Sequence, residues 1–251
     1  LDSVRVQTYR NIEIVVIDDG SSNPLTINFL DQLEKSIHVV RQTNQGLPSA
    51  RNAGFRAASG EYVLPLDADD WLEHDAIERL LMALQDNPQA AFAFAYMRME
   101  GEGEGILAKQ YNFFEQLFLN QLPYCLLLRK EAWQEVGGYD ESMRKGYEDW
   151  EFNIRLGAAG MHGVVAPVPL FHYRISRTGM LLTTSNRVHG ELWKAIRHKH
   201  ESLYRPGTIF KLWRKWACYP STYPLWVYLF WLSAVKILPG VVFAALFRFI
   251  R

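Results

Sequence analysis

The chain has 251 residues, with 27 Lys and Arg against 27 Asp and Glu, and 49% of its residues are apolar. This composition is typical of a globular protein and excludes an intrinsically disordered chain or a collagen-like fibre. The two cysteines, Cys125 and Cys218, exclude a disulfide framework and a four-cysteine zinc site, and they favour a reduced, cytoplasmic compartment.

Strand and helix patterns alternate through the N-terminal part of the chain. The β-branched run at 12–17 predicts a strand, and apolar residues at helical spacing predict a helix over 25–35. The same two patterns predict further elements, which in chain order are a strand over 37–40, a helix over 44–59, a strand over 61–66, a helix over 71–85 and a strand over 90–99. This alternation is typical of a parallel sheet with right-handed crossovers, in which ligands bind beyond the carboxyl ends of the strands.

The middle of the chain is less regular. Gly101–Gly105 alternates glycine with glutamate and predicts a flexible, acidic hairpin or loop. Apolar spacing and glycine stops then predict, in order, a helix over 113–120, a strand over 125–128, a helix over 130–136 and a helix over 147–159. No internal repeat or low-complexity tract interrupts this order.

Three carboxylates lie together after the strand predicted over 61–66, at Asp67, Asp69 and Asp70. Gathering like charges costs free energy unless a cation neutralises them, and carboxylates without neighbouring cysteines suit a hard cation such as Mg²⁺ or Mn²⁺. Mg²⁺ takes only one or two protein carboxylates when a diphosphate and waters complete its shell, so a short turn is sufficient. Asp69 or Asp70 can instead cap the helix predicted from Trp71, and the two roles can coexist.

The first predicted strand also ends in an acidic turn, Asp18-Asp19-Gly20-Ser21-Ser22. A carboxylate here can accept hydrogen bonds from a base or a ribose, whereas either serine can simply cap the next helix. Near the start of the helix predicted over 44–59, Arg51 is placed to meet a phosphate or a base, or it is an ordinary surface arginine. Because both acidic turns fall at strand ends, we expect Asp19 and Asp69 at the same edge of the sheet.

Titratable groups also stand at two positions further along the chain. Glu148 and Asp149 open the helix predicted over 147–159, where the helix dipole favours negative charge. The functional alternative is a general base that projects from the start of a helix into a cleft. His172 follows an apolar stretch and is either structural or a metal ligand through its neutral imidazole.

Five motifs therefore follow one another along the chain. They are Asp18-Asp19-Gly20-Ser21-Ser22, Asn44-x-Gly46-x-x-x-Ala50-Arg51-Asn52-x-Gly54, Leu66-Asp67-Ala68-Asp69-Asp70, Gly137-Gly138-Tyr139-Asp140-Glu141 and Glu148-Asp149. In this order and at these spacings they resemble the inverting family 2 glycosyltransferases with the GT-A fold, over roughly residues 4–175. The resemblance implies an α/β GT-A-type sandwich with a mostly parallel sheet in a catalytic domain over 1–180. Residues 181–251 are expected to form a helical tail that is basic and apolar and associates with the membrane.

The resemblance also implies roles for the acidic turns. Asp18 and Asp19 are expected to contact the nucleobase and ribose of a sugar nucleotide, and Arg51 to help hold the nucleotide. Asp67 and Asp69 form the Asp-x-Asp motif of the family, which binds the donor and a Mn²⁺ or Mg²⁺ ion. Of these two residues, Asp69 is expected to be the principal metal ligand.

The same resemblance places the chemistry at Asp149, as the catalytic base, with Glu148 supporting or orienting it. His172 matches a position at which some relatives place a further metal or diphosphate contact. The expected reaction moves one sugar, preferably from a UDP-sugar, to a hydroxyl of a glycan or lipid-linked acceptor in envelope glycan synthesis, with inversion. The alternative is a non-catalytic module that binds a sugar nucleotide or a membrane, and no nucleic acid partner is expected.

The chain departs from the family pattern at two points. Family members begin with a strand and a nucleotide-contacting turn ahead of the helix that here starts near Leu1, and that strand is absent. Its absence predicts an exposed sheet edge and an incomplete base pocket. Either the chain is a fragment or its donor binding is impaired, and since it also opens with Leu rather than Met, we expect a fragment. The Gln-x-x-Arg-Trp motif of processive relatives is also absent, which favours transfer of a single sugar.

The C-terminal part differs from the rest in charge and hydropathy. Residues 1–160 carry 14 Lys and Arg and 25 Asp and Glu. Residues 161–251 carry 13 Lys and Arg but only two acidic residues. The apolar stretches 225–235 and 237–247 are separated by Lys236, which is costly inside a bilayer, so two short helices in the membrane interface fit better than a crossing. One alternative is a helix pair buried against the catalytic domain or against another subunit. The other is simple electrostatic attraction between the two halves. We expect a cytoplasmic protein, peripheral on the inner face of the cell membrane.

Overall fold

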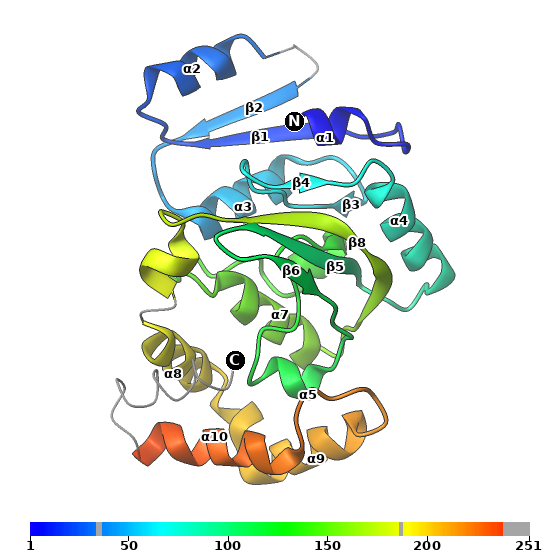
Figure 1. Ribbon diagram of the computed structural model, residues 1–251, viewed down its shortest axis with the longest axis vertical. Helices are drawn as coiled ribbons and strands as arrows, with labels where there is room; N and C mark the ends of the chain where they lie inside the picture. Colours follow the sequence, from blue (N-terminus) through cyan, green and yellow to red (C-terminus); the bar gives the residue numbers. More distant parts are fainter. Residues whose placement is uncertain (34–36, 186–187, 238–251) are drawn as a thin grey trace.

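The computed structural model describes residues 1–33, 37–185 and 188–237, and Figure 1 shows their arrangement. Part of the predicted tail, residues 238–247, and the end of the helix predicted over 25–35 lie outside the described residues. None of the helices in the described ranges combines the length and the apolar character needed to span a bilayer.

Two parallel strands and a short helix form the N-terminal layer. β1 (Ile14–Asp19) pairs with β2 (Ile37–Gln42), and α2 (Pro24–Asp31) makes the crossover between them. All three elements confirm the predictions, with shifted ends. The α2 helix is capped by Asn23, whose side chain accepts a hydrogen bond from the amide of Leu25 at 2.9 Å, so neither serine of the preceding turn is the cap.

A mixed six-stranded sheet forms the centre of the molecule, with the strand order β3-β7-β5-β8-β4 and β6 beside β5. Its strands are β3 (Tyr62–Val63), β4 (Trp71–Leu72), β5 (Phe92–Gly101), β6 (Gly105–Leu107), β7 (Leu127–Arg129) and β8 (Gly163–Ile175). β5 and β8 run parallel, and the other pairs in this sheet are antiparallel. The strands predicted between 12 and 99 therefore do not share one parallel sheet, because β3 pairs antiparallel with β7 and β1 lies in the separate N-terminal layer.

The helix predicted over 71–85 begins later than its apolar spacing indicates. Trp71 starts β4, which pairs antiparallel with β8, and α4 (Ala76–Asp86) begins after it. The indole ring of Trp71 stacks on the imidazole ring of His172 with centroids 5.0 Å apart. This cross-strand packing outweighs the local helical preference. The capping role considered for Asp69 is therefore excluded.

Helices cover both faces of the central sheet (Figure 1). The other described helices are α1 (Asp2–Arg5), α3 (Leu47–Ala57), α5 (Phe113–Gln116), α6 (Lys130–Glu135), α7 (Glu148–Ala158), α8 (His189–Lys199), α9 (Pro206–Trp216) and α10 (Leu225–Ile237), with a π-helical turn η1 (Leu181–Ser185) and a 3-10 turn η2 (Glu201–Tyr204). Along β5, Phe92 and Phe94 belong to the core beneath the C-terminal helices, whereas Ala93 and Ala95 belong to the core beneath α4. This alternation follows from the two-residue period of a strand.

The C-terminal helices pack into the same core as the central sheet. Trp193 of α8, Ile209 of α9 and both Tyr228 and Trp231 of α10 are buried in the cluster that also contains Phe92. One face of the segment that the sequence predicts as a tail thus rests on the rest of the chain. For the first predicted helix, over 225–235, this inward face matches the alternative of burial against the catalytic domain. Residues 238–247 of the second predicted helix lie outside the described residues.

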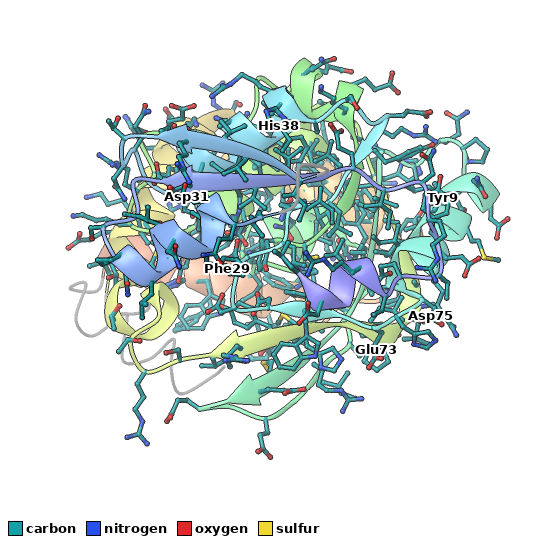
Figure 2. All side chains as sticks on the ribbon, turned by 90° about the horizontal axis from the view of Figure 1, so that it is seen from above. Tyr9, Phe29, Asp31, His38, Glu73 and Asp75 are labelled. Atoms are coloured by element: carbon teal, nitrogen blue, oxygen red, sulfur yellow. The ribbon has the colours of Figure 1, made fainter. Side chains whose placement is uncertain are left out.

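The α2 helix lies at the opposite end of the molecule from α9 and α10 (Figure 1). Figure 2 views this end from above and labels Phe29 and Asp31 on the helix. Leu25 and Phe29 are 79% and 56% exposed, while Asp31 pairs with Arg41 of β2 at 2.5 Å. The helix thus presents apolar side chains to solvent, but its own sequence contains no basic residue.

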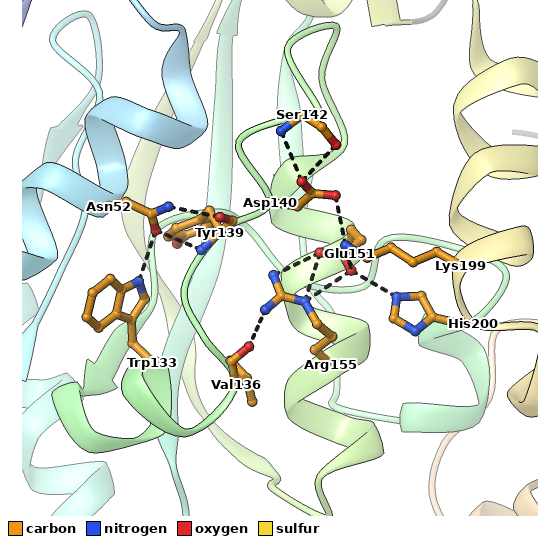
Figure 3. A network of polar contacts seen from close by, with 10 residues as sticks. All are labelled: Asn52, Trp133, Val136, Tyr139, Asp140, Ser142, Glu151, Arg155, Lys199 and His200. Atoms are coloured by element: carbon orange, nitrogen blue, oxygen red, sulfur yellow. Dashed lines mark hydrogen bonds and ion pairs between the residues drawn. The ribbon is translucent and has the colours of Figure 1, made fainter.

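A buried asparagine joins α3 to the turn that leads toward α7 (Figure 3). The Asn52 side chain donates to the carbonyl of Tyr139 at 2.8 Å and accepts from the amide of Tyr139 at 2.7 Å and the indole of Trp133 at 3.2 Å. Gly138 has φ +74°, and a Cβ there would lie 2.7 Å from Asn52 Oδ1. Only glycine fits this close approach, so the Gly137-Gly138 motif holds the turn against α3.

Glu151 fixes α7 to the end of α8 (Figure 3). Its buried carboxylate accepts a hydrogen bond from Arg155 Nε at 2.9 Å, lies 2.9 Å from His200 Nε2, and pairs with Lys199 Nζ at 2.6 Å. Lys199 also reaches Asp140 at 2.8 Å. Burial by itself raises the pKa of Glu151, but the hydrogen bonds from His200 and Arg155 and the charges of the basic partners lower it to about 2. This network sets the position of the helix that begins at Glu148.

Replacing Glu151 by Gln is expected to lower the free energy of unfolding by about 3 kcal/mol at neutral pH, because three basic side chains lose a buried partner. Since the pKa of Glu151 is lowered in the folded state, its contribution is complete above the ordinary value of 4.5 and is lost as the pH falls toward about 2. Urea unfolding followed by tryptophan fluorescence checks this. The exposed Glu131→Gln is the control, and a difference from wild type that stays constant across this pH window would contradict the prediction.

Candidate active site

A cavity of about 400 Å³ brings the predicted functional residues together. Arg51 of α3, Asp67 and Asp69 after β3, and Glu148 and Asp149 at the start of α7 all line it. The volume lies in the range of small-molecule binding sites. Residues from three distant segments therefore meet in one hollow of suitable size for a ligand.

Arg51 stands between two of these carboxylates. Its guanidinium donates to Glu148 Oε1 at 2.6 Å and to the two oxygens of Asp67 at 3.1 and 3.2 Å. The residue is only 8% exposed, and its guanidinium carbon lies 4.5 Å from the centroid of the Tyr124 ring. Burial opposes the charge, but the Asp67 and Glu148 carboxylates raise the pKa of Arg51 above its ordinary value. Arg51 is therefore a buried clamp and not an ordinary surface arginine.

Asp70, the third carboxylate of the cluster, shapes the turn. It accepts hydrogen bonds from the Tyr124 hydroxyl at 2.6 Å and from the amide of Arg174 at 2.7 Å, and the same hydroxyl accepts from the amide of Asp67 at 2.8 Å. Burial raises the pKa of Asp70 to about 6, with Asp67 and Asp69 adding to the effect. Both oxygens of Asp70 thus accept hydrogen bonds from the protein. Asp67 and Asp69, and not Asp70, line the cavity.

Asp69 is the exposed member of the cluster. Its carboxylate makes no hydrogen bond or ion pair with a described residue, and it lines the cavity beside Asp67. Within the described ranges, no group of three or more His, Cys, Asp or Glu side chains converges to hold a metal ion. A pair of carboxylates fits Mg²⁺ or Mn²⁺ when phosphate oxygens and waters supply the remaining ligands. The donor set at Asp67 and Asp69 therefore suits the ion that the sequence predicts.

Glu148 and Asp149 occupy the start of α7, where the helix dipole favours a negative charge. Tyr147, just before them, adopts φ +65°, a left-handed conformation that turns the chain into the helix. The side-chain amide of Asn120 donates to Asp149 Oδ2 at 2.8 Å. Burial raises the pKa of both carboxyl groups, and the charge of Arg51 opposes this rise. A hydrogen-bonded carboxylate with a raised pKa at a cavity wall is suited to accept a proton.

Asp18 and Asp19 lie at the end of β1 and are absent from the lining of the cavity. Asp18 accepts a hydrogen bond from the amide of Ser21 at 2.8 Å. Asp19 accepts from the amides of Gln45 and Gly46, each at 2.8 Å, and so holds the turn that leads into α3. Leu47, the first residue of α3, lines the cavity, so this turn adjoins the cavity wall. Asp19 ends a strand of the two-stranded sheet, whereas Asp69 follows a strand of the six-stranded sheet, so the prediction that they share one sheet edge is wrong. A direct contact of Asp18 or Asp19 with a ligand stays a prediction.

His172 lies on β8, outside the lining of the cavity. Its Nδ1 is 2.7 Å from Glu100 Oε1, and its Nε2 is 2.9 Å from Glu73 Oε1. Both ring nitrogens therefore face carboxylates, and neither is turned toward Asp67 and Asp69. The arrangement gives no support to the expected metal contact and matches the structural alternative.

Several residues of the site carry no signal in the sequence. Asn120 orients Asp149, Tyr124 supports the acidic turn, and Lys109 together with Thr222 and Tyr223 completes the cavity wall. Each is a single polar or aromatic residue far from the recognised motifs. Such residues gain their roles only through tertiary contacts, so no local pattern could identify them.

Replacing Arg51 by Gln is expected to lower the free energy of unfolding by roughly 3–5 kcal/mol, because Glu148 keeps a buried charge without its partner. Without Arg51 the pKa of Glu148 in the folded state rises further above its ordinary value of 4.5. The free energy of unfolding therefore falls as the pH rises above that ordinary value, because the folded state must then release a proton to form a buried charge. Urea unfolding should therefore show a greater loss at mildly alkaline than at mildly acidic pH.

The double variant R51Q/E148Q should recover part of this loss, because it removes the unpaired charge as well. Arg56→Gln, on the exposed side of the same helix, is the matched control and should change the stability little. An equal loss at both pH values, together with no recovery in the double variant, would contradict the clamp.

The geometry can be compared with known proteins. The family model described as Glycosyl transferase family 2 matches residues 1–159. EpsH of Bacillus subtilis, whose name carries the word glycosyltransferase, is 28% identical over 199 residues, which cover 70% of this chain and 56% of EpsH. Glycosyltransferase GlyA of Streptococcus pneumoniae is 46% identical over 83 residues, covering 32% of this chain and 12% of GlyA. The chain thus spans about half of EpsH and a small part of GlyA.

Among solved structures, S. aureus TarS in complex with UDP-GlcNAc has a TM-score of 0.65 and 18% sequence identity, over 82% of this chain and 62% of that one. At this identity the likeness concerns the fold alone. It confirms the predicted α/β architecture of the GT-A type. Because the family model covers well over half of the sequence, the chain belongs to glycosyl transferase family 2.

Proposed function

We propose that this chain transfers one sugar from a nucleotide-sugar, with a UDP-sugar as the first choice, to an acceptor hydroxyl with inversion. The observation that carries the proposal is the cavity in which Asp67 and Asp69 face Glu148 and Asp149 around Arg51. TarS, which shares the fold, has been crystallised with UDP and with UDP-GlcNAc, which supports the choice of donor.

Asp149 is the proposed base. Inversion in one step needs a carboxylate on the side of the sugar opposite the leaving diphosphate, and it needs no nucleophile from the enzyme. Asp149 accepts the proton of the acceptor hydroxyl. At the same time the acceptor oxygen bonds to the anomeric carbon, and the bond between that carbon and the diphosphate oxygen breaks. The hydrogen bond from Asn120 at 2.8 Å orients the carboxylate for this transfer.

Arg51 and Glu148 hold the two walls of the cavity in position. Arg51 holds both Glu148 and Asp67, so it couples the wall that carries the base to the wall that carries the acidic turn. Its guanidinium is already engaged by two carboxylates. We therefore propose that it aids nucleotide binding indirectly, by holding Asp67, in place of the direct contact that the resemblance implies.

Asp67 and Asp69 are the residues that would hold a Mn²⁺ or Mg²⁺ ion. Such an ion, when bound, offsets the charge that develops on a departing nucleoside diphosphate. Asp69 has no competing partner among the described residues, which supports its role as the principal ligand. For His172 no metal role is proposed, because both of its ring nitrogens face glutamates.

The remaining parts of the proposal concern the two substrates. Asp18 and Asp19 are proposed to contact the nucleobase and ribose when the donor binds against the turn after β1. The acceptor is proposed to be a glycan or lipid-linked hydroxyl of the envelope, reached from the cytoplasmic face of the membrane. The second candidate is a non-catalytic module that binds a sugar nucleotide or a membrane, and turnover of the donor distinguishes the two.

Calorimetric titration of UDP is expected to show binding in the presence of Mn²⁺ and little without it. Asp69→Ala should abolish the metal-dependent part, and because Asp69 is exposed and unbonded, the fold should be unaffected. Asp86→Ala, at another exposed aspartate, which ends α4, is the matched control. Metal-dependent binding of UDP that survives in D69A would refute this assignment.

Asp149→Asn is expected to reduce turnover of the donor by roughly 10²–10⁴-fold, the usual worth of a general base. UDP binding in Mn²⁺ should persist, which makes it the internal control. Release of UDP from UDP-sugars in the presence of candidate acceptors is the measurement. A wild-type protein that binds UDP with Mn²⁺ but turns over no donor, even by hydrolysis, would favour the non-catalytic module.

A further inference from the structure

The α10 helix is apolar on both of its long sides. Its buried positions, spaced for one helix face, are Val227, Tyr228, Trp231 and Ala234. The opposite side exposes Trp226, Leu229 and Phe230 by 69%, 44% and 46%. A helix with apolar residues all round is normally covered all round. The outward side of α10 is therefore a surface that favours contact with another apolar phase.

The α9 helix exposes a basic side with an aromatic residue on it. Phe210 is 52% exposed, and Lys211, Arg214 and Lys215 are exposed with it at helical spacing. None of the three basic side chains forms an ion pair with a residue that the structure describes. Their charges are therefore available to an anionic surface.

The two helices lie at the same end of the molecule, away from β1 and β2 (Figure 1). We define the docking face by their exposed residues, which are Phe210, Lys211, Arg214, Lys215, Trp226, Leu229 and Phe230. From residue 202 to the end, the sequence contains no Asp or Glu. The docking face is thus apolar and basic without a neighbouring acidic side chain from its own segment.

Two occupants fit an exposed apolar face, namely a second copy of the chain and a lipid surface. A symmetric contact between two copies places the same patch against itself. Lys211, Arg214 and Lys215 would then approach their own copies, which like-charge repulsion opposes. An anionic lipid surface satisfies the charges and the apolar groups together, because basic residues meet headgroups while tryptophan and phenylalanine enter the interface.

We propose that the docking face binds a membrane surface that contains anionic lipid, with α9 and α10 lying in the interface. Trp226 and Phe230 insert their rings below the headgroups, and the basic residues of α9 pair with lipid phosphates. The inward sides of the same helices remain packed on the core, so the docked protein keeps its fold.

Docking also positions the cavity. Thr222 and Tyr223, which line it, lie in the segment that joins α9 to α10. Buried Glu115 of α5 anchors this segment, because it accepts hydrogen bonds from the Ser221 hydroxyl at 2.9 Å, the Thr222 hydroxyl at 3.1 Å and the Tyr228 hydroxyl. The cavity wall is therefore tied to the docked helices, which favours an acceptor anchored in lipid. That last step rests on the proposed function, whereas the docking itself does not.

Flotation of the full chain with vesicles tests the docking without donor or acceptor. We expect binding to vesicles of phosphatidylcholine with phosphatidylglycerol, and weak binding to phosphatidylcholine alone. Trp226→Ser with Phe230→Ser should lower the partition coefficient at least about tenfold. Lys211→Gln with Arg214→Gln should lower the partition coefficient roughly 25-fold, at about fivefold for each charge. The loss caused by removing these two charges should be smaller at high salt.

Matched controls lie at the far end of the molecule. Leu25→Ser with Phe29→Ser removes from α2 two apolar side chains that are each more exposed than their counterparts Trp226 and Phe230. Arg10→Gln removes an exposed charge from the loop before β1. Both should bind vesicles like wild type. Thermal unfolding and UDP binding with Mn²⁺ should be unchanged in the W226S/F230S variant, so failure of docking is distinguishable from failure of the proposed glycosyl transfer.

Cys218 offers a direct probe of the segment between the helices. It is exposed, whereas Cys125 is buried, so a thiol-reactive, environment-sensitive fluorophore labels it selectively. Its emission should shift to the blue with anionic vesicles and stay unchanged with phosphatidylcholine. The proposal is overturned if neither variant of the docking face weakens binding, if anionic vesicles are not bound, or if the face instead drives a concentration-dependent dimer that W226S/F230S abolishes.

Discussion

A buried positive charge organises the candidate site. The guanidinium of Arg51 joins Asp67 to Glu148, which come from segments 16 and 97 residues away along the chain. Two ionised carboxylates in a site of low dielectric repel each other unless a cation lies between them. The Tyr124 ring covers one side of this cation at 4.5 Å. Without this charge, the carboxylates on the wall that carries the acidic turn would repel those on the wall that carries the proposed base.

The frame around this cation is itself held by buried polar groups. Asn52 ties α3 to the turn at Gly138, and Glu151 ties α7 to the end of α8. Both contacts flank residues of the cavity, since Arg51 precedes Asn52 and Asp149 lies two positions before Glu151. Aromatic packing supplies the bulk of the core, but these polar contacts determine where the two helices stand relative to each other, because hydrogen bonds are directional and dispersion contacts are not.

The C-terminal helices have two chemically different sides. Their inward sides complete the core beneath the central sheet, and Glu115 fastens the segment between them to α5. Their outward sides are apolar and basic, which suits the interface of an anionic membrane. Since Thr222 and Tyr223 of the same segment line the cavity, a protein docked in this way would present its proposed acceptor side close to the bilayer.

The sequence by itself determined the local elements and the acidic turns: the period of apolar residues located β1, α2, β2, α3 and α7, and charge clustering singled out Asp67, Asp69, Glu148 and Asp149. Only the tertiary structure decided the rest. It made Trp71 a strand residue instead of a helix start and bonded Asp70 to Tyr124. It placed both ring nitrogens of His172 against Glu73 and Glu100, and it turned Arg51 into a clamp between Asp67 and Glu148. It also recruited Asn120. The physical reason is that periodicity and turn chemistry act between near neighbours, whereas strand pairing, burial and the partners of a charge depend on residues far away in the chain.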